Sequence, residues 1–155
     1  MASKCEGALY AGVDVGSANA KAVLVDDAGT VRGYAVVPSG VGLVSAAQHV
    51  LTGALAQASQ SRDAVKVIVS TGYGRDIVPD KMKAMTEITC HARGAVALFP
   101  DTRFVIDIGG QDSKAIAVGP KGNVTGFEMN DKWAAGTGRF LEVMARALEV
   151  GLDKM

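Results

Sequence analysis

Residues 13 to 36 read VDVGSANAKAVLVDDAGTVRGYAV, and residues 106 to 129 read IDIGGQDSKAIAVGPKGNVTGFEM. The two stretches align without a gap at a constant offset of 93, with eight of the 24 positions identical and most others pairing two apolar residues. This offset is too long for a solenoid repeat, so we interpret the chain as a duplicated domain. The identical pairs are Asp14/Asp107, Gly16/Gly109, Lys21/Lys114, Ala22/Ala115, Val25/Val118, Gly29/Gly122, Val31/Val124 and Gly33/Gly126.

Each copy shows the same order of predicted elements. An apolar, β-rich run leads through a glycine turn to a second strand, then through another glycine turn to a third strand. Apolar residues spaced three and four apart then predict a helix. The first strands are 10–15 and 104–108, the second strands are 21–25 and 114–118, and the helical patterns cover 43–55 and 140–148.

The first copy continues beyond its helix, and the second does not. A buried strand at 65–70, the sequence TGYGR and a helix at 87–98 precede Pro100. Subtracting the offset places the last residue at position 62 of the first copy, before that strand. Three strands and a helix alone would leave a sheet edge uncovered. We therefore predict a first half at 8–100, a truncated second half at 101–155, and a chain that is a fragment of a longer protein.

The composition points to a globular domain with a small-molecule or protein partner. Of 155 residues, 48% are apolar and 21% are charged, and 16 basic residues balance 16 acidic ones. No run of like charge favours nucleic acid or an anionic membrane. The first ten residues lack the apolar core of a signal peptide, and charged residues interrupt every apolar run. We expect a cytoplasmic protein, in which Cys5 and Cys90 form no disulfide.

The two Asp-x-Gly turns suggest a phosphate and magnesium site. A carboxylate at a strand end, followed by glycine, sets a negative charge beside backbone N–H groups that can approach a ligand. Facing each other, two such turns could hold hydrated Mg²⁺ and cradle phosphates. A helix start with glycines would add partial positive charge. The candidates are Asp14 and Asp107 for Mg²⁺ through water; Gly16, Ser17, Ala18, Lys21, Gly109, Gly110, Gln111 and Asp112 for the nucleotide; Gly136, Thr137 and Gly138 at the helix start; and Gln111 to orient the attacking water.

Each of these features also has a simpler reading. A single Asp-x-Gly is more often an ordinary hairpin, and only the duplicated pair favours a site. Lys21 could equally be an outward-facing strand lysine. His91, beside Cys90, lacks further ligands at metal spacing, so a packed or capping histidine is favoured. Cys90 is typical of a buried small apolar residue, and Arg75 could make an ion pair or contribute to an interface.

Five stretches resemble one known family along nearly the whole chain. They are GVDVGSANAK, STGYGR, ITCHARGA, VIDIGGQDSKAI and MNDKWAAGTGRFLEVMA, and they are similar to the ATP-dependent activators of 2-hydroxyacyl-CoA dehydratases and the related benzoyl-CoA reductase ATPase subunits. The resemblance implies a duplicated RNase H-like, actin-like ATPase fold with a mixed five-stranded sheet. It also implies MgATP between two halves and a homodimer that carries one [4Fe-4S] cluster. ATP hydrolysis would then drive a low-potential electron into the partner enzyme.

The chain departs from the family's pattern at Trp133. The family motif has cysteine at this position as a cluster ligand, and an indole offers an N–H but no thiolate. A second family cysteine would lie beyond Met155. The resemblance therefore implies a chain without a competent cluster site, in which Trp133 covers an apolar helix start or an interface.

Two other functions remain open at this point. A small-molecule kinase of the same fold would share the phosphate turns, although the short loops before Val65 leave little room for a substrate insertion. A non-catalytic regulatory or interaction module would explain the loss at position 133, but the intact Asp14 and Asp107 turns oppose it. The phosphate contacts alone must overcome the entropy of holding a ligand, so we expect weak nucleotide binding and little activity from this chain in isolation.

Overall fold

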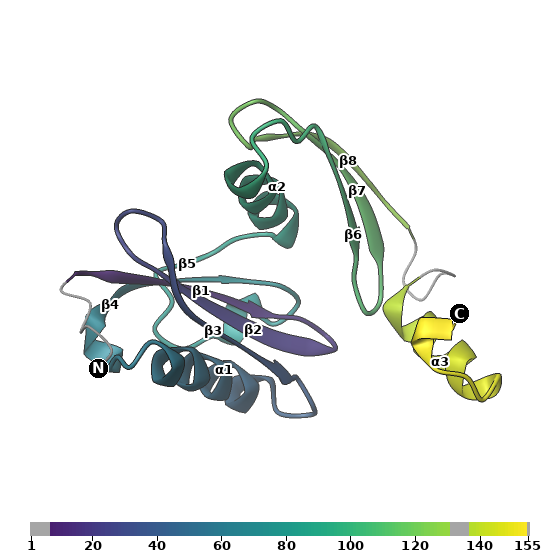
Figure 1. Cartoon of the computed structure of the whole chain (residues 1–155), viewed down its shortest axis with the longest axis horizontal. Helices are drawn as coiled ribbons and strands as arrows, with labels where there is room; N and C mark the ends of the chain where they lie inside the picture. Colours follow the sequence, from purple (N-terminus) through teal and green to yellow (C-terminus); the bar gives the residue numbers. More distant parts are fainter. Residues whose placement is uncertain (1–6, 131–136, 155) are drawn as a thin grey trace. The chain divides into compact units, whose positions relative to one another are not determined.

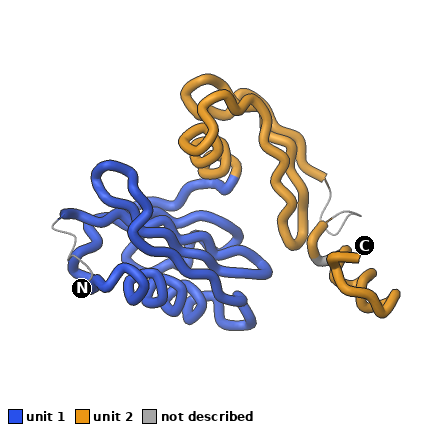
Figure 2. Tube along the Cα trace, viewed as in Figure 1, with its two compact units in different colours: residues 1–87 blue, residues 88–155 orange. Residues whose placement is uncertain are grey.

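The structure is a computed structural model that describes residues 7–130 and 137–154. The chain forms two compact units, residues 1–87 and 88–155, each described here by itself (Figure 2). In the described ranges, no helix is long and apolar enough to cross a membrane.

The first unit is built on a mixed five-stranded sheet in the order β3-β2-β1-β4-β5 (Figure 1). Strands β1 (Leu9–Val15), β2 (Asn19–Val25) and β3 (Val31–Pro38) form an antiparallel meander, and β4 (Val65–Thr71) and β5 (Lys83–Ala84) add in parallel. A parallel neighbour needs a long crossover, which here contains helix α1 (Leu43–Gln57). The predicted mixed five-stranded sheet is thus confirmed.

Helix α1 covers one face of this sheet. Its small and branched residues at three- and four-residue spacing form a buried stripe that packs on the alternate residues of β1 and β2. Val13 and Val15 of β1 and Leu24 of β2 are almost fully buried in this core. The other face of the same strands carries Asp14, Lys21 and Val23, all at least partly accessible to solvent.

The second unit holds a three-stranded antiparallel meander, with helix α2 against one face of it. The elements are α2 (Glu87–Leu98), β6 (Phe104–Ile108), β7 (Ser113–Val118), β8 (Val124–Met129) and α3 (Gly138–Ala147). Ala92 of α2, Ile116 and Val118 form a small buried core, and Ile88 and Val96 of α2 pack against it. This face of the sheet also carries Asp107 and Lys114, which pair across β6 and β7.

The two meanders match residue by residue, as the duplication predicts. Asp14 pairs with Lys21 in the first, and Asp107 pairs with Lys114 in the second. A register shift follows Leu24 in β2 and its counterpart Ala117 in β7. Gly29 and Gly122 both adopt positive φ, at 78° and 72°, a conformation that strongly favours glycine.

The units divide between Glu87 and Ile88, whereas the duplication places the division at 100/101. The difference concerns helix α2, whose apolar residues pack on strands β7 and β8. Cys90, expected to pack within the first half, therefore lies in the second unit and is half-buried. The halves 8–100 and 101–155 of the duplicated domain remain a prediction.

Candidate functional site

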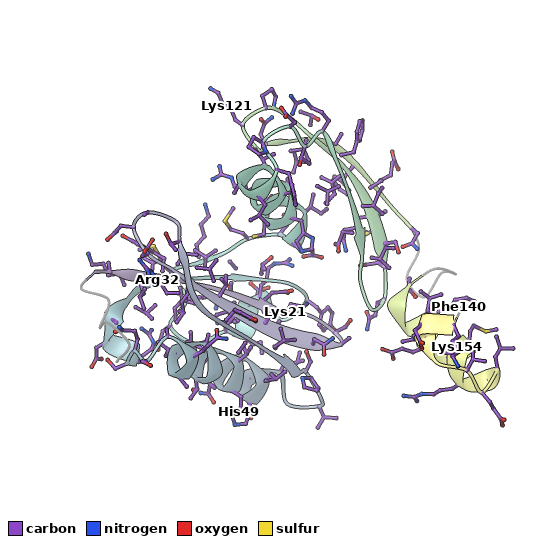
Figure 3. All side chains as sticks on the ribbon, in the orientation of Figure 1. Lys21, Arg32, His49, Lys121, Phe140 and Lys154 are labelled. Carbon is purple, nitrogen blue, oxygen red and sulfur yellow. The ribbon has the colours of Figure 1, made fainter. Side chains whose placement is uncertain are left out.

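The first Asp-x-Gly turn joins β1 to β2. Asp14 lies one residue before the end of β1, and its Oδ2 is 2.9 Å from Nζ of Lys21, a half-exposed side chain of β2 (Figure 3). The Gly16 N–H donates to the Asn19 carbonyl at 3.1 Å and closes the turn. A Cβ at position 16 would lie 2.9 Å from the same carbonyl, so the turn requires glycine.

Ser39 supports this turn and was not anticipated from the sequence. It is buried, its hydroxyl donates to the Gly16 carbonyl at 2.6 Å, and its N–H donates to the Ala18 carbonyl at 3.0 Å. The carbonyls of Gly16 and Ala18 are thereby occupied. The N–H groups of Ser17 and Ala18 have no acceptor among the described residues. A Ser after the third strand carried no recognisable signal in the sequence.

The TGYGR sequence packs against the end of β1. Gly72 has φ +85°, and a Cβ there would lie 2.2 Å from Oδ1 of Asp14 and 2.7 Å from the Val15 carbonyl. The Gly74 N–H donates to the same carbonyl at 2.8 Å. Arg75 holds this loop through its Nη1, which donates to the Gly72 carbonyl at 3.2 Å and lies 3.8 Å from Oε2 of Glu87. Both glycines are thus required beside Asp14.

The second Asp-x-Gly turn repeats the first with different neighbours. The Gly109 N–H donates to the Asp112 carbonyl at 2.8 Å, which matches the bond of Gly16 to Asn19. In this turn the N–H groups of Gly110 and Gln111 lack acceptors among the described residues. Lys114, almost fully buried, contacts Oδ1 of Asp112 at 2.5 Å and lies 3.7 Å from Oδ2 of Asp107.

His91 of α2 lies beside Asp107. Its Nδ1 lies 3.1 Å from Oδ2 of Asp107, whose side chain is 17% exposed. The pKa of Asp107 is lowered, chiefly by the adjacent His91 and further by the positive charge of Lys114, although burial opposes the shift. The carboxylate thus stays ionised at neutral pH. The favoured sequence interpretation, a packed or capping histidine, missed this contact.

The start of α3 lies against the second turn. The Gly138 N–H donates to the Gly109 carbonyl at 2.9 Å. Thr137 is fully buried, and its hydroxyl accepts a hydrogen bond from the Phe140 N–H at 3.4 Å as the N-cap of α3. Gly138 thus lies directly beside the second turn. Gly136 and Trp133 lie outside the described residues.

Each unit therefore presents one turn with the same chemical parts. A carboxylate at a strand end, a lysine across the hairpin, and two N–H groups without acceptors among the described residues occur in both. Such N–H groups can donate to phosphate oxygens, and a carboxylate can bind hydrated Mg²⁺. The residues present fit a nucleotide with its metal.

The residues present do not fit an iron–sulfur cluster held in the family's manner. Cys90 is the single cysteine of the described ranges, and those ranges contain no group of three or more metal-ligating side chains. Position 133 is tryptophan, whose indole supplies no thiolate.

Comparison with known proteins decides the family. The model of the BadF/BadG/BcrA/BcrD ATPase family matches residues 11–155. The chain belongs to this family. The activator of lactoyl-CoA dehydratase from Anaerotignum propionicum is 49% identical over 144 residues, which cover 93% of this chain and 55% of that protein. The chain thus spans about half the length of the curated relatives it matches.

Two solved structures of the family share the fold. The (R)-2-hydroxyglutaryl-CoA dehydratase component A of Acidaminococcus fermentans matches with TM-score 0.86 and 40% identity, over 95% of this chain and 56% of that one. The activator of the 2-hydroxyisocaproyl-CoA dehydratase from Clostridium difficile, with bound ADPNP, matches with TM-score 0.86 and 39% identity, over 94% and 54%. These matches confirm the predicted actin-like ATPase fold.

Proposed function

We propose that this chain supplies the two phosphate-binding turns of an ATPase that activates a 2-hydroxyacyl-CoA dehydratase or a benzoyl-CoA reductase. The observation that carries the proposal is the repetition of one turn in both units, with an ionisable carboxylate and two N–H groups without acceptors in the described ranges. Family membership and the ADPNP-bound relative, which is 39% identical, support it.

The proposed roles follow from the chemistry of each group. Asp14 and Asp107 accept hydrogen bonds from the waters of Mg²⁺, which supplies charge neutralisation at the phosphates when bound. The N–H groups of Ser17, Ala18, Gly110 and Gln111 donate to phosphate oxygens. The partial positive charge at the start of α3, near Thr137 and Gly138, favours the same anion.

Two further roles are assigned to side chains of the turns. Lys21 and Lys114 keep positive charge beside the carboxylates, so that the turns are not purely anionic where phosphate binds. The Gln111 amide orients the attacking water, a task that an uncharged donor and acceptor can perform without ionising.

The partner and the assembly also belong to the proposal. The names of the relatives support a CoA-ester dehydratase or reductase as the partner. A homodimer rests on the family resemblance alone. No electron-transfer step is assigned to this chain, because tryptophan at position 133 cannot ligate iron. Light scattering of the complete encoded protein would test the dimer.

The test is steady-state ATP hydrolysis by the complete encoded protein with Mg²⁺. Asp14→Asn and Asp107→Asn should each lower kcat by roughly 100-fold, because each removes a charge that positions the metal. Asp63→Asn is the matched control, since Asp63 is an exposed carboxylate in the short helix Arg62–Ala64. Parent-like hydrolysis in both site variants would exclude the proposed roles of the two carboxylates.

A further inference from the structure

The cross-strand lysines of the two turns make different contacts. Lys21 lies 2.9 Å from Asp14, whereas its counterpart Lys114 lies 3.7 Å from Asp107 and 2.5 Å from Asp112. The residue aligned with Asp112 in the first copy is Asn19, whose amide carries no charge. A charged acceptor binds an ammonium more strongly than a neutral one. In the second copy, Asp112 therefore binds Lys114. In the first copy, the aligned Lys21 binds the strand-end carboxylate of Asp14 instead.

His91 lies closer to the carboxylate of Asp107 than Lys114 does. Its Nδ1 lies 3.1 Å from Oδ2 of Asp107, which is a direct contact between the imidazole and the carboxylate. The neighbouring residue Ala92 is fully buried against Ile116, so the backbone that carries the imidazole is fixed on the sheet. His91 lies before residues 106–129, so the gapless alignment of the two copies does not include it.

The ion-pair contacts of His91 and Lys114 with Asp107 fall on the same carboxylate oxygen. His91 and Lys114 both lie nearest to Oδ2. Contacts with this oxygen limit the rotation of the carboxylate and thereby fix the position of Oδ1. We infer that His91 is a positioning residue for Asp107, taking the part that Lys21 plays for Asp14. This inference rests on the proposed function, because it concerns how Asp107 is held for the waters of Mg²⁺. Partners of this indirect kind commonly change metal affinity or activity by about 10- to 100-fold.

A double-mutant cycle in the complete encoded protein tests the inference. His91→Ala should lower kcat for ATP hydrolysis roughly 10-fold and change KM for ATP less than about twofold, because the phosphate contacts of the turns persist. Asp112→Asn recreates the Asn19 of the first copy and frees Lys114 to approach Asp107. In that background, His91→Ala should cost less than about threefold. A purely structural histidine would cost the same in both backgrounds, and that result would overturn the inference.

Two further variants keep the test decisive. His91→Asn retains an N–H donor near the place of Nδ1 and should recover most of the loss seen with alanine. This outcome remains informative if His91→Ala folds poorly. His49→Ala is the matched control, since His49 is the other histidine of the sequence and lies on the side of α1 away from the sheet (Figure 3). It should match the parent.

Failure of the inference is distinguishable from failure of the proposed function. Loss of hydrolysis in Asp107→Asn, together with parent-like His91→Ala, would overturn the positioning role and leave the proposed function standing. Parent-like Asp107→Asn would overturn both, because His91 is assigned to act through Asp107.

Discussion

The sheets of β1–β3 and β6–β8 share their register, their bulge and their turns, yet helices cover opposite faces of them. Val13 is 1% exposed beneath α1, whereas its counterpart Ile106 is 70% exposed. Conversely, Ile116 is fully buried beneath α2, while its counterpart Val23 is 36% exposed. Because the strand patterns are alike, the packed helix decides which face becomes the core.

This difference also sets the surroundings of the two carboxylates. Asp14 lies on the face of its sheet that α1 does not cover, so its partner comes from the neighbouring strand. Asp107 lies on the face that α2 does cover, and its nearest partner comes from the helix. The two Asp-x-Gly motifs thereby acquire different supports, although they occupy matching places in their sheets.

The largest expected effect on stability comes from substituting aspartate at one of two aligned positions, Val13 in the first sheet and Ile106 in the second. Val13→Asp should lower the free energy of unfolding of the first unit by at least about 3 kcal/mol, because it buries an unpaired carboxylate. Ile106→Asp should change the stability of the second unit by less than about 1 kcal/mol. Urea titration of the 155-residue chain, read by hydrogen exchange in peptides from each meander, measures both.

The same substitution at the aligned pair Ile116 and Val23 checks that prediction, because there the buried residue lies in the second unit. Ile116→Asp should destabilise the second unit and Val23→Asp should leave the first nearly unchanged. Equal losses from Val13→Asp and Ile106→Asp would show that the open face of β6–β8 is covered in solution, contrary to the comparison.

A smaller effect is expected at the aligned glycines Gly33 and Gly126. A Cβ at Gly33 would lie 2.4 Å from the Ala54 carbonyl of α1, whereas at Gly126 no described heavy atom lies within 4 Å. Gly33→Ala should therefore destabilise its unit by about 2 kcal/mol, and Gly126→Ala should stay within about 0.5 kcal/mol of the parent. The same exchange experiment applies, and a costly Gly126→Ala would contradict the open face.

The smallest expected effect concerns the turns between the second and third strands. Oδ1 of Asp26 accepts from the N–H groups of Ala28 and Thr30, and its Oδ2 pairs with Arg32 at 2.6 Å. The aligned residue of the second copy is Gly119. Asp26→Gly should lower the midpoint of thermal unfolding by a few degrees, because it removes these local bonds.

The effect of Asp26 should depend on pH in a defined direction. Its folded pKa is lowered below 3.8, first by the backbone hydrogen bond from Thr30 and then by Arg32. The stabilisation is therefore present above the unfolded pKa and is lost as the pH falls through the folded value. The difference in midpoint between parent and Asp26→Gly should be constant near neutral pH and shrink well below pH 3.8. A difference unchanged in strong acid would show that charge contributes nothing at this turn.

The sequence predicted the features that depend on local chemistry. Gly29 and Gly122 mark turns that need positive φ, and apolar, β-rich runs predicted the strands β1 and β6, so the strands and turns of both meanders were predicted from residue types alone. The Asp14 and Asp107 turns were predicted because strand-end carboxylates and glycines stand at fixed spacing.

The features that depend on tertiary packing could not be predicted. Strands β6 and β7 carry apolar residues on both faces, as Ile106 and Ile116 show, so no pattern indicated which face α2 would cover. The contact of His91 with Asp107 follows from that choice. Ser39 and Gly72 reach the first turn from segments distant in sequence, and their support of it likewise had no local signal.

The parallel pairing of β1 with β4 has a consequence for the order of folding. Asp14 pairs with Thr71 across these strands, while its antiparallel partner Lys21 is only seven residues away. Short loops close at a lower entropic cost than long ones, so the hairpin can form during synthesis before β4 has left the ribosome. We therefore expect the carboxylate to meet its lysine early and the TGYGR loop late. The first Asp-x-Gly turn thus forms early, and the TGYGR loop packs against it later.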